Sequence, residues 1–120
     1  MVWKLDDSRP IWLQLKEEIT EKIITGHYPP GEKLDSVREL ASEAGVNPNT
    51  MQRALSQLDA DGLTETSRTS GRFVTSDLSV VNKVRVELAE EKTEKFLKSM
   101  EKIGFNRDDI ISIIKGESVK

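Results

Sequence analysis

A run of polar side chains without a carboxylate is the most suggestive chemical feature of this 120-residue sequence. No acid occurs between Asn47 and Leu58, and the run carries the polar side chains of Asn49, Thr50, Gln52, Arg53 and Gln57. Asn and Gln can form paired hydrogen bonds with adenine, Arg can do so with guanine, and Thr can contact a thymine methyl group or a phosphate. These residue types on one exposed surface are typical of contacts to DNA.

The residues around this run predict a helix-turn-helix. Asn47 and Pro48 suit the cap and the first position of a helix. Its buried face would consist of Met51, Ala54, Leu55 and Leu58. Just upstream, Ser36 and Glu39 match a capping box, and Gly45 suits the left-handed end of the short helix that they begin. Two short helices joined by such a tight turn leave the polar side chains of the second helix exposed.

A β-hairpin is predicted after these helices. Residues 64–67 and 72–75 contain β-prone side chains and flank a polar tip at residues 68–71. A hairpin beside a helix in the major groove would bring further cations to DNA phosphates. The expected DNA-binding residues are Arg38, Asn47, Asn49, Thr50, Gln52, Arg53, Arg68, Thr69 and Arg72. Arg53 would select bases, with Asn49 and Gln52 in support. The backbone would be held by Arg38, Thr50, Arg68 and Arg72, although Arg38 and Arg53 could exchange roles.

The beginning of the chain predicts a short strand and an amphipathic helix. Residues 3–5 alternate between apolar and polar side chains, which favours a short edge strand. Ser8 would cap the helix, with Pro10 in its first turn. The helix would end at Gly26. Its buried face would consist of apolar side chains that recur every four residues: Ile11, Leu15, Ile19 and Ile23.

Residues 78–120 predict two further helices and a dimer interface. Asp77 would cap a long helix from Leu78 to about Ile103, and a short helix would begin near Asn106. A segment of 43 residues is too small to bury both apolar faces, so we expect a second copy of the chain to cover them. The expected dimerisation residues are Leu78, Val81, Val84, Leu88, Phe96, Met100, Ile110, Ile111 and Ile114.

The ordered motifs of the first 77 residues resemble the DNA-binding domain of GntR-type bacterial transcription regulators. They are PGEKL at 30–34, SVRELA at 36–41, GVNPNTMQRAL at 45–55 and LDADGL at 58–63. The short tail resembles the YtrA-like branch of that family. This resemblance implies a mainly α fold with a small β-hairpin wing, in which residues 1–77 form a winged helix-turn-helix and residues 78–120 a helical dimerisation tail. It also implies a repressor that binds an inverted-repeat operator in double-stranded DNA as a homodimer, commonly at a transporter operon.

The sequence departs from the family pattern at two places. Asp35 stands where the family usually has Pro, which puts an acid near the expected DNA face. The tip of the hairpin reads Arg-Thr-Ser-Gly-Arg, whereas the family usually has Arg-Gly-x-Gly-Thr. Arg72, which replaces that last Thr, is expected to contact a phosphate. No residue identifies the operator sequence, the regulated genes or an effector.

Composition excludes several classes of protein. The chain has no Cys and only one His, His27, so neither a metal cluster, a cysteine nucleophile nor a catalytic triad can be assembled. We expect no enzyme activity, no metal and no cofactor. The longest apolar runs are far too short to span a membrane, and the first residues lack an apolar signal core. A cytoplasmic protein without a membrane partner is therefore expected.

The charge of the chain leaves one alternative open. The net charge is −3 and the pI is about 5.3, whereas DNA-binding proteins usually have a basic surface. The alternative is a winged-helix module that docks onto another protein and does not bind DNA. The acid-free run from Asn47 to Leu58 argues against it, because the acids lie outside the expected contact surface.

Overall fold

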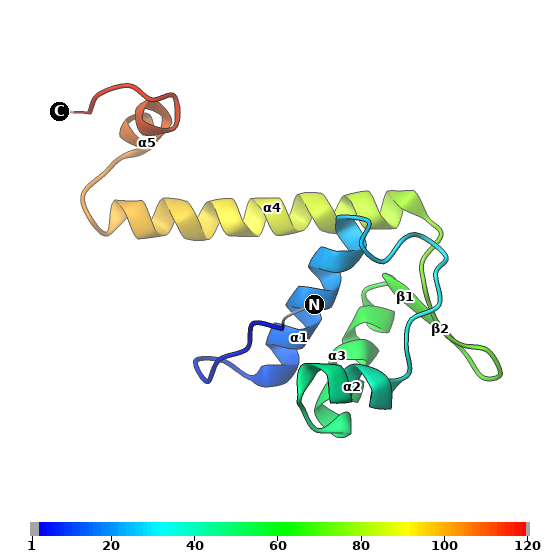
Figure 1. The fold of residues 1–120 in the computed structure, drawn as a ribbon. Helices are drawn as coiled ribbons and strands as arrows, with labels where there is room; N and C mark the ends of the chain where they lie inside the picture. Colours follow the sequence, from blue (N-terminus) through cyan, green and yellow to red (C-terminus); the bar gives the residue numbers. More distant parts are fainter. Residues whose placement is uncertain (1–2, 120) are drawn as a thin grey trace. The chain divides into compact units, whose positions relative to one another are not determined.

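The computed structural model describes residues 3–119, in which five helices and one two-stranded hairpin follow one another (Figure 1). They are α1 (Ile11–Ile24), α2 (Val37–Ala44), α3 (Pro48–Ala60), β1 (Thr64–Ser67), β2 (Gly71–Val74), α4 (Leu78–Glu101) and α5 (Arg107–Ile114). The predicted fold class is confirmed: a mainly helical chain with a hairpin wing, followed by two further helices.

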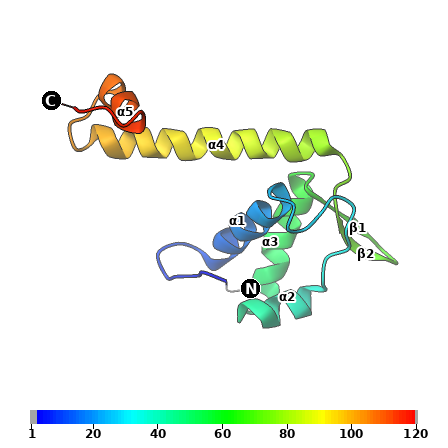
Figure 2. The same cartoon turned by 45° about the horizontal axis from the view of Figure 1, so that its top comes forward.

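The chain divides into two compact units, one up to Val84 and one from Arg85 onward. In the first unit α3 packs against both α1 and α2 (Figures 1 and 2). The buried core consists of Leu15, Ile19, Ile23, Leu34, Leu40, Ala41, Met51, Ala54, Leu55, Leu58, Leu63 and Val74. The boundary after Val84 has a physical reason, because three valines at the start of α4 pack against this core: Val80, Val81 and Val84. The predicted functional boundary at residue 77 stays a prediction.

Local capping interactions set the helix-turn-helix. The Ser36 hydroxyl accepts a hydrogen bond from the Glu39 amide at 3.1 Å, and the Glu39 carboxylate accepts one from the Ser36 amide at 3.3 Å. Gly45 ends α2 with a φ of +71°, a conformation that L side chains rarely adopt. Asn47 then caps α3, accepting the Asn49 amide at 2.8 Å. The predicted caps and turn are confirmed.

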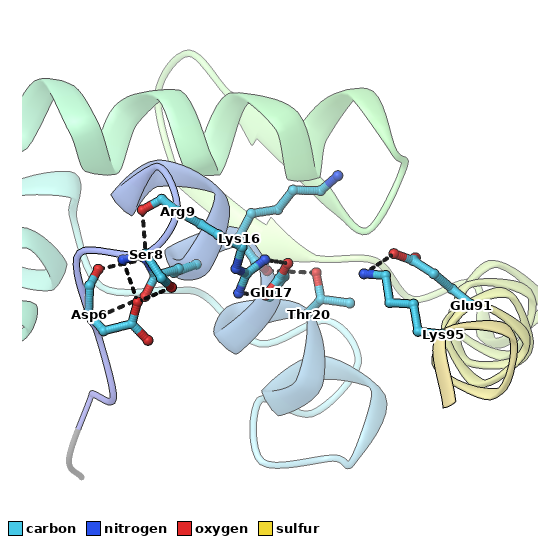
Figure 3. Close-up of polar contacts among 9 residues, drawn as sticks. Asp6, Ser8, Arg9, Lys16, Glu17, Thr20, Glu91 and Lys95 are labelled. Atoms are coloured by element: carbon cyan, nitrogen blue, oxygen red, sulfur yellow. Dashed lines mark hydrogen bonds and ion pairs between the residues drawn. The ribbon is translucent and has the colours of Figure 1, made fainter. Parts of the chain in front are cut away.

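The start of α1 differs from the prediction. Pro10 occupies the cap position without a side-chain hydrogen bond, so the helix begins at Ile11. Ser8 lies two residues before this cap position, and its hydroxyl donates to the Asp6 carboxylate instead of capping α1 (Figure 3). The Gln14 amide group donates to the carbonyls of Asp6 and Arg9, both at 2.8 Å. A side chain from within the helix therefore holds the segment before it.

The predicted edge strand at residues 3–5 is wrong, because this segment has no strand partner. Side chains of neighbouring helices hold it instead. The Lys4 amide donates to Glu18 at 2.7 Å, and the Lys22 ammonium lies 3.6 Å from the centre of the Trp3 ring. The Trp3 indole N–H also donates to Glu43 at 3.3 Å. The alternation that suggested a strand has another cause, since Trp3 and Leu5 both pack against the core and Lys4 between them is exposed.

The hairpin is confirmed, with its second strand shifted by one residue. Thr64 pairs with Val74 and Ser67 with Gly71, so β2 begins at Gly71. The residues before α2 bond to the other edge of β2, since the Leu34 amide donates to the Arg72 carbonyl and the Val74 amide to the Glu32 carbonyl, each at 2.9 Å. Backbone bonds on both edges of β2 therefore attach the hairpin to the rest of the unit.

The second unit contains most of α4 and all of α5. At the start of α4, within the first unit, the Asp77 carboxylate accepts a hydrogen bond from the Ser79 amide at 2.9 Å and caps the helix. The helix ends at Glu101, two residues before the predicted end near Ile103, and Gly104 follows in the chain. α5 begins with a capping box formed by Asn106 and Asp109. Ile110 is buried, whereas α4 has no fully buried side chain. The exposed side of α4 carries ion pairs such as Lys95 with Glu91, 3.1 Å apart (Figure 3).

Replacing Leu55 with alanine is expected to lower the free energy of unfolding by about 2–5 kcal/mol, because the substitution leaves a cavity in the core. The Leu55 side chain is 1% exposed. Urea unfolding followed by circular dichroism measures the change. Gln57→Ala, on the exposed face of the same helix, is the control and is expected to change the value by less than about 0.5 kcal/mol. Equal losses in both variants would contradict the assignment of the two faces of α3.

Candidate nucleic-acid interface

The exposed face of α3 carries the predicted base-reading side chains. Asn49, Gln52 and Arg53 are exposed and Thr50 is half-buried, on the side of the helix opposite its buried residues. Gln52 donates to the Ser56 hydroxyl at 3.0 Å, which holds its amide along the helix surface. The structure therefore brings together the amides and the guanidinium that the sequence placed in one run.

The first turn of α3 satisfies its own amides. The Asn49 amide donates to the Asn47 side chain, and the Thr50 amide donates to the Asn47 carbonyl at 3.0 Å. The side-chain oxygen of Asn47 is thus occupied as a cap, and its NH₂ group is the part that can face a ligand. Side chains, more than free backbone amides, are the groups through which this end of α3 can bind a phosphate.

Arg53 lies against an aromatic ring of α1. The centre of its guanidinium is 4.2 Å from the centre of the Trp12 ring. Such a contact attracts the cation to the ring face, while the N–H groups at the edge of the guanidinium can still donate hydrogen bonds. Trp12 therefore restricts the motion of Arg53 without blocking its donors. Nothing in the local pattern signals this contact, because the two residues are far apart in the sequence.

Two exposed arginines flank α3. Arg38 is the second residue of α2, and Arg68 follows β1 at the tip of the hairpin, which extends away from the helices (Figures 1 and 2). Among residues 3–119 neither guanidinium has an ion-pair partner. Thr69, beside Arg68, is exposed as well. Both cations are therefore available to a negatively charged ligand.

Arg72 has a different environment from the other predicted contacts. Its Nε and Nη2 donate to the Asp59 carboxylate at 3.1 and 3.0 Å, and its side chain is only 11% exposed. Asp59 also accepts hydrogen bonds from Thr64 and Thr66. Partial burial raises the pKa of the Asp59 carboxyl, but the hydrogen bonds from Arg72, Thr64 and Thr66 outweigh this and hold the pKa below its ordinary value. No sequence motif indicates Asp59 as the partner of Arg72, because the two residues are thirteen positions apart.

The predicted dimerisation residues fall into two groups. Leu78, Phe96, Ile111 and Ile114 are exposed, and Leu88 and Met100 are partly exposed. Val81 and Val84 pack against the core of the first unit, and Ile110 is 2% exposed, so these three have apolar neighbours within the chain. Three further exposed apolar side chains were not predicted as interface residues: Val86, Ile103 and Ile113.

No helix among the described residues has the length and apolar content needed to cross a membrane. The part of the chain that the structure describes also contains no group of three His, Cys, Asp or Glu side chains that could hold a metal ion.

Residues 12–74 match the family described as bacterial regulatory proteins, gntR family. The chain belongs to this family. It is 35% identical over 112 residues to the uncharacterized HTH-type transcriptional regulator YhcF of Bacillus subtilis, with 93% of each chain covered. It is 39% identical over 70 residues to the HTH-type transcriptional repressor YtrA of the same species, covering 58% of this chain and 54% of YtrA. The predicted GntR family and YtrA-like branch are confirmed, and the chain is a bacterial transcription regulator. These relatives are named as regulators and not as enzymes.

Solved structures agree with this assignment. The chain is similar to a GntR family transcriptional regulator from Listeria monocytogenes, with a TM-score of 0.86, 38% identity and coverage of 95% of this chain and 100% of that one. It is also similar to AraR(DBD) in complex with operator ORE1, with a TM-score of 0.55, 30% identity and coverage of 62% and 94%. The first likeness spans nearly the whole chain, whereas the second spans a part.

Gly71→Ala is expected to lower the free energy of unfolding by about 1–2 kcal/mol, since an L residue is strained at positive φ. Gly71 has a φ of +104°, and a Cβ there would lie 2.9 Å from the Cε atom of Lys33. The lysine side chain can move aside, so the backbone conformation carries the cost. Denaturant unfolding of Gly71→Ala, with Ser70→Ala as control, measures it. Full rescue by an added Lys33→Ala would show that the side-chain clash, and not the backbone, is responsible.

Proposed function

We propose that this GntR-family regulator represses transcription by binding, as a homodimer, to an inverted-repeat operator in double-stranded DNA. The observation that carries the proposal is the exposed face of α3, which has no acid from Asn47 to Leu58, together with the exposed guanidiniums of Arg38 and Arg68 on the elements before and after it. A helix with such a face fits the major groove, and flanking cations neutralise phosphates on either side. The operator complex of the similar AraR(DBD) and the repressor name of YtrA support it.

The side chains have separate roles in this proposal. Arg53, held against Trp12, has its donors oriented before DNA arrives, which favours base selection over a loose phosphate contact. Asn49 and Gln52 lie beside it on the same face. The remaining contacts are to the backbone and come from Arg38, Asn47, Thr50, Arg68 and Thr69. Arg72 is left out because its guanidinium is engaged by Asp59.

The homodimer would form through the exposed apolar side chains of the second unit. Ile114 is 70% exposed, and Ile111, Ile113 and Ile103 are exposed close to it in the sequence. Large exposed apolar side chains in such number on a small unit favour contact with another protein surface. A second copy of the chain is the partner that an inverted repeat requires, because the two-fold symmetry of the protein then matches that of the DNA.

The docking-module alternative is not favoured. Its support was the acidic pI and the departures from the family pattern at the hairpin tip, whereas the exposed face of α3 has no acid from Asn47 to Leu58. A regulator that acts on bacterial operator DNA works in the cytoplasm and needs neither an enzymatic reaction nor a cofactor to do so.

Arg53→Ala is expected to weaken binding to the operator by about 1–3 kcal/mol, and binding to unrelated DNA by less, because only the operator presents the matching base. Arg68→Ala is expected to weaken both similarly and to lower the slope of log affinity against log salt by about one unit. Fluorescence anisotropy at several salt concentrations measures both, on an operator first selected from random duplexes. We expect that operator to contain half-sites roughly 10 base pairs apart or a near multiple.

Arg107→Ala is the control for these variants, since it removes the same charge from α5, outside the proposed contacts. If neither Arg38→Ala, Arg53→Ala nor Arg68→Ala changes the affinity for any duplex, the proposed interface is wrong.

Light scattering at micromolar concentration is expected to give twice the 13.5 kDa mass of one chain. Ile114→Glu is expected to shift the protein towards the monomer, because a buried carboxylate at the interface would lose its hydration. Arg107→Ala, which leaves the apolar surface of α5 unchanged, is expected to stay dimeric. A persistent 13.5 kDa species in the unmodified protein would contradict the dimer.

A further inference from the structure

Asp59 is the centre of a hydrogen-bond network between α3 and the hairpin. Its Oδ1 accepts from Arg72 Nε at 3.1 Å and from the Thr64 hydroxyl, and its Oδ2 accepts from Arg72 Nη2 at 3.0 Å and from the Thr66 hydroxyl at 2.8 Å. Four donors from β1 and β2 thus converge on one carboxylate of α3. Thr66 and Arg72 are themselves cross-strand partners, so the network holds both strands at the same level of the hairpin.

The location of this carboxylate is unfavourable without its partners. Asp59 lies in the last turn of α3, where the helix dipole disfavours a negative charge, and that turn contains no basic residue. Its side chain is 29% exposed, so solvent compensates only part of the charge. Near a DNA face an acid also repels phosphate. A charge with these costs is stabilised here by the guanidinium and hydroxyls of the hairpin.

We propose that Asp59 and Arg72 are positioning residues, which form a clamp between the end of the recognition helix α3 and the hairpin and thereby aim the hairpin tip at DNA. The proposal rests on the DNA-binding function above. Arg72 contributes through Asp59 and not through a phosphate. Arg68, at the tip, follows Thr66 by two residues along the chain and precedes Arg72, the cross-strand partner of Thr66, by four. A rotation of the strands against α3 would therefore displace Arg68 from the phosphates that it contacts.

The sign of the effect of Asp59→Asn separates the clamp from simple electrostatics. If Asp59 only repelled DNA, removal of its charge would tighten binding. A clamp predicts weaker binding, by about tenfold at the operator, which corresponds to about 1.4 kcal/mol. Asp61→Asn is the matched control, because Asp61 follows the same helix end and pairs with Lys16 at 3.1 Å, away from the hairpin. The control is expected to bind as tightly as the unmodified protein or slightly more tightly.

Arg72→Gln separates the clamp from a phosphate contact. A phosphate contact predicts a salt slope lowered by about one unit, as for Arg68→Ala. The clamp predicts that Arg72→Gln and Asp59→Asn have the same salt slope and about the same tenfold loss of affinity, because both variants displace Arg68 from its phosphates. The double variant Asp59→Asn/Arg72→Gln is then expected to bind no more weakly than either single variant, because both remove one interaction.

Hydrogen exchange of the free protein tests the clamp without DNA. In Asp59→Asn the amides of β1 and β2 are expected to exchange faster, while the core amides of α1 and α3 keep their protection, which also rules out general unfolding. Faster exchange in the hairpin together with no DNA binding by the unmodified protein would reject the proposed function and leave the clamp itself supported. Tighter DNA binding by Asp59→Asn, a salt slope about one unit lower in Arg72→Gln than in Asp59→Asn, or unchanged exchange in the hairpin would each overturn the clamp.

Discussion

The burial of one face of α3 is the constraint on which the rest of the first unit depends. Met51, Leu55 and Leu58 are enclosed by α1 and α2, and burial of apolar side chains of this size is the main favourable contribution to folding a small core. Once that face is fixed, the helical period leaves the opposite side chains in solvent. The same packing that stabilises the unit therefore selects Asn49, Gln52 and Arg53 as the side chains that can meet a ligand.

The position of the wing depends on two kinds of bond. Backbone hydrogen bonds on both edges of β2 attach the hairpin to the segment before α2. Side-chain bonds to Asp59 attach it to α3. The backbone bonds set the location of the strands, whereas the carboxylate constrains their rotation, since its acceptors have defined directions. A basic residue in the wing is for this reason not automatically a DNA contact, and the partner of each guanidinium decides its role.

The long helix α4 contributes to both units because its apolar side chains have different neighbours along its length. Val80, Val81 and Val84 complete the core of the first unit, and beyond them the helix has no buried side chain. A stripe of apolar residues at helical spacing indicates only that some surface covers it. Whether that surface belongs to the same chain, as for Val81, or to another, as proposed for Ile114, depends on the tertiary contacts.

The sequence by itself determined the features that arise within a few residues. The capping box of Ser36 and Glu39, the Asn47 cap, the period of α1 and the two faces of α3 follow from local hydrogen bonds and from helical geometry, and the structure agrees with each. Tertiary structure decided what depends on distant partners. The Ser8 hydroxyl donates to Asp6, and the Gln14 side chain holds the segment before α1. Trp3 packs on Lys22 without forming a strand, and Arg53 contacts the Trp12 ring. Arg72 donates to Asp59, thirteen residues away in the sequence, because the hairpin packs next to the end of α3. A charge pattern indicates which side chains are able to bind DNA. The packing of the helices and strands decides which of these side chains form hydrogen bonds or ion pairs within the protein instead.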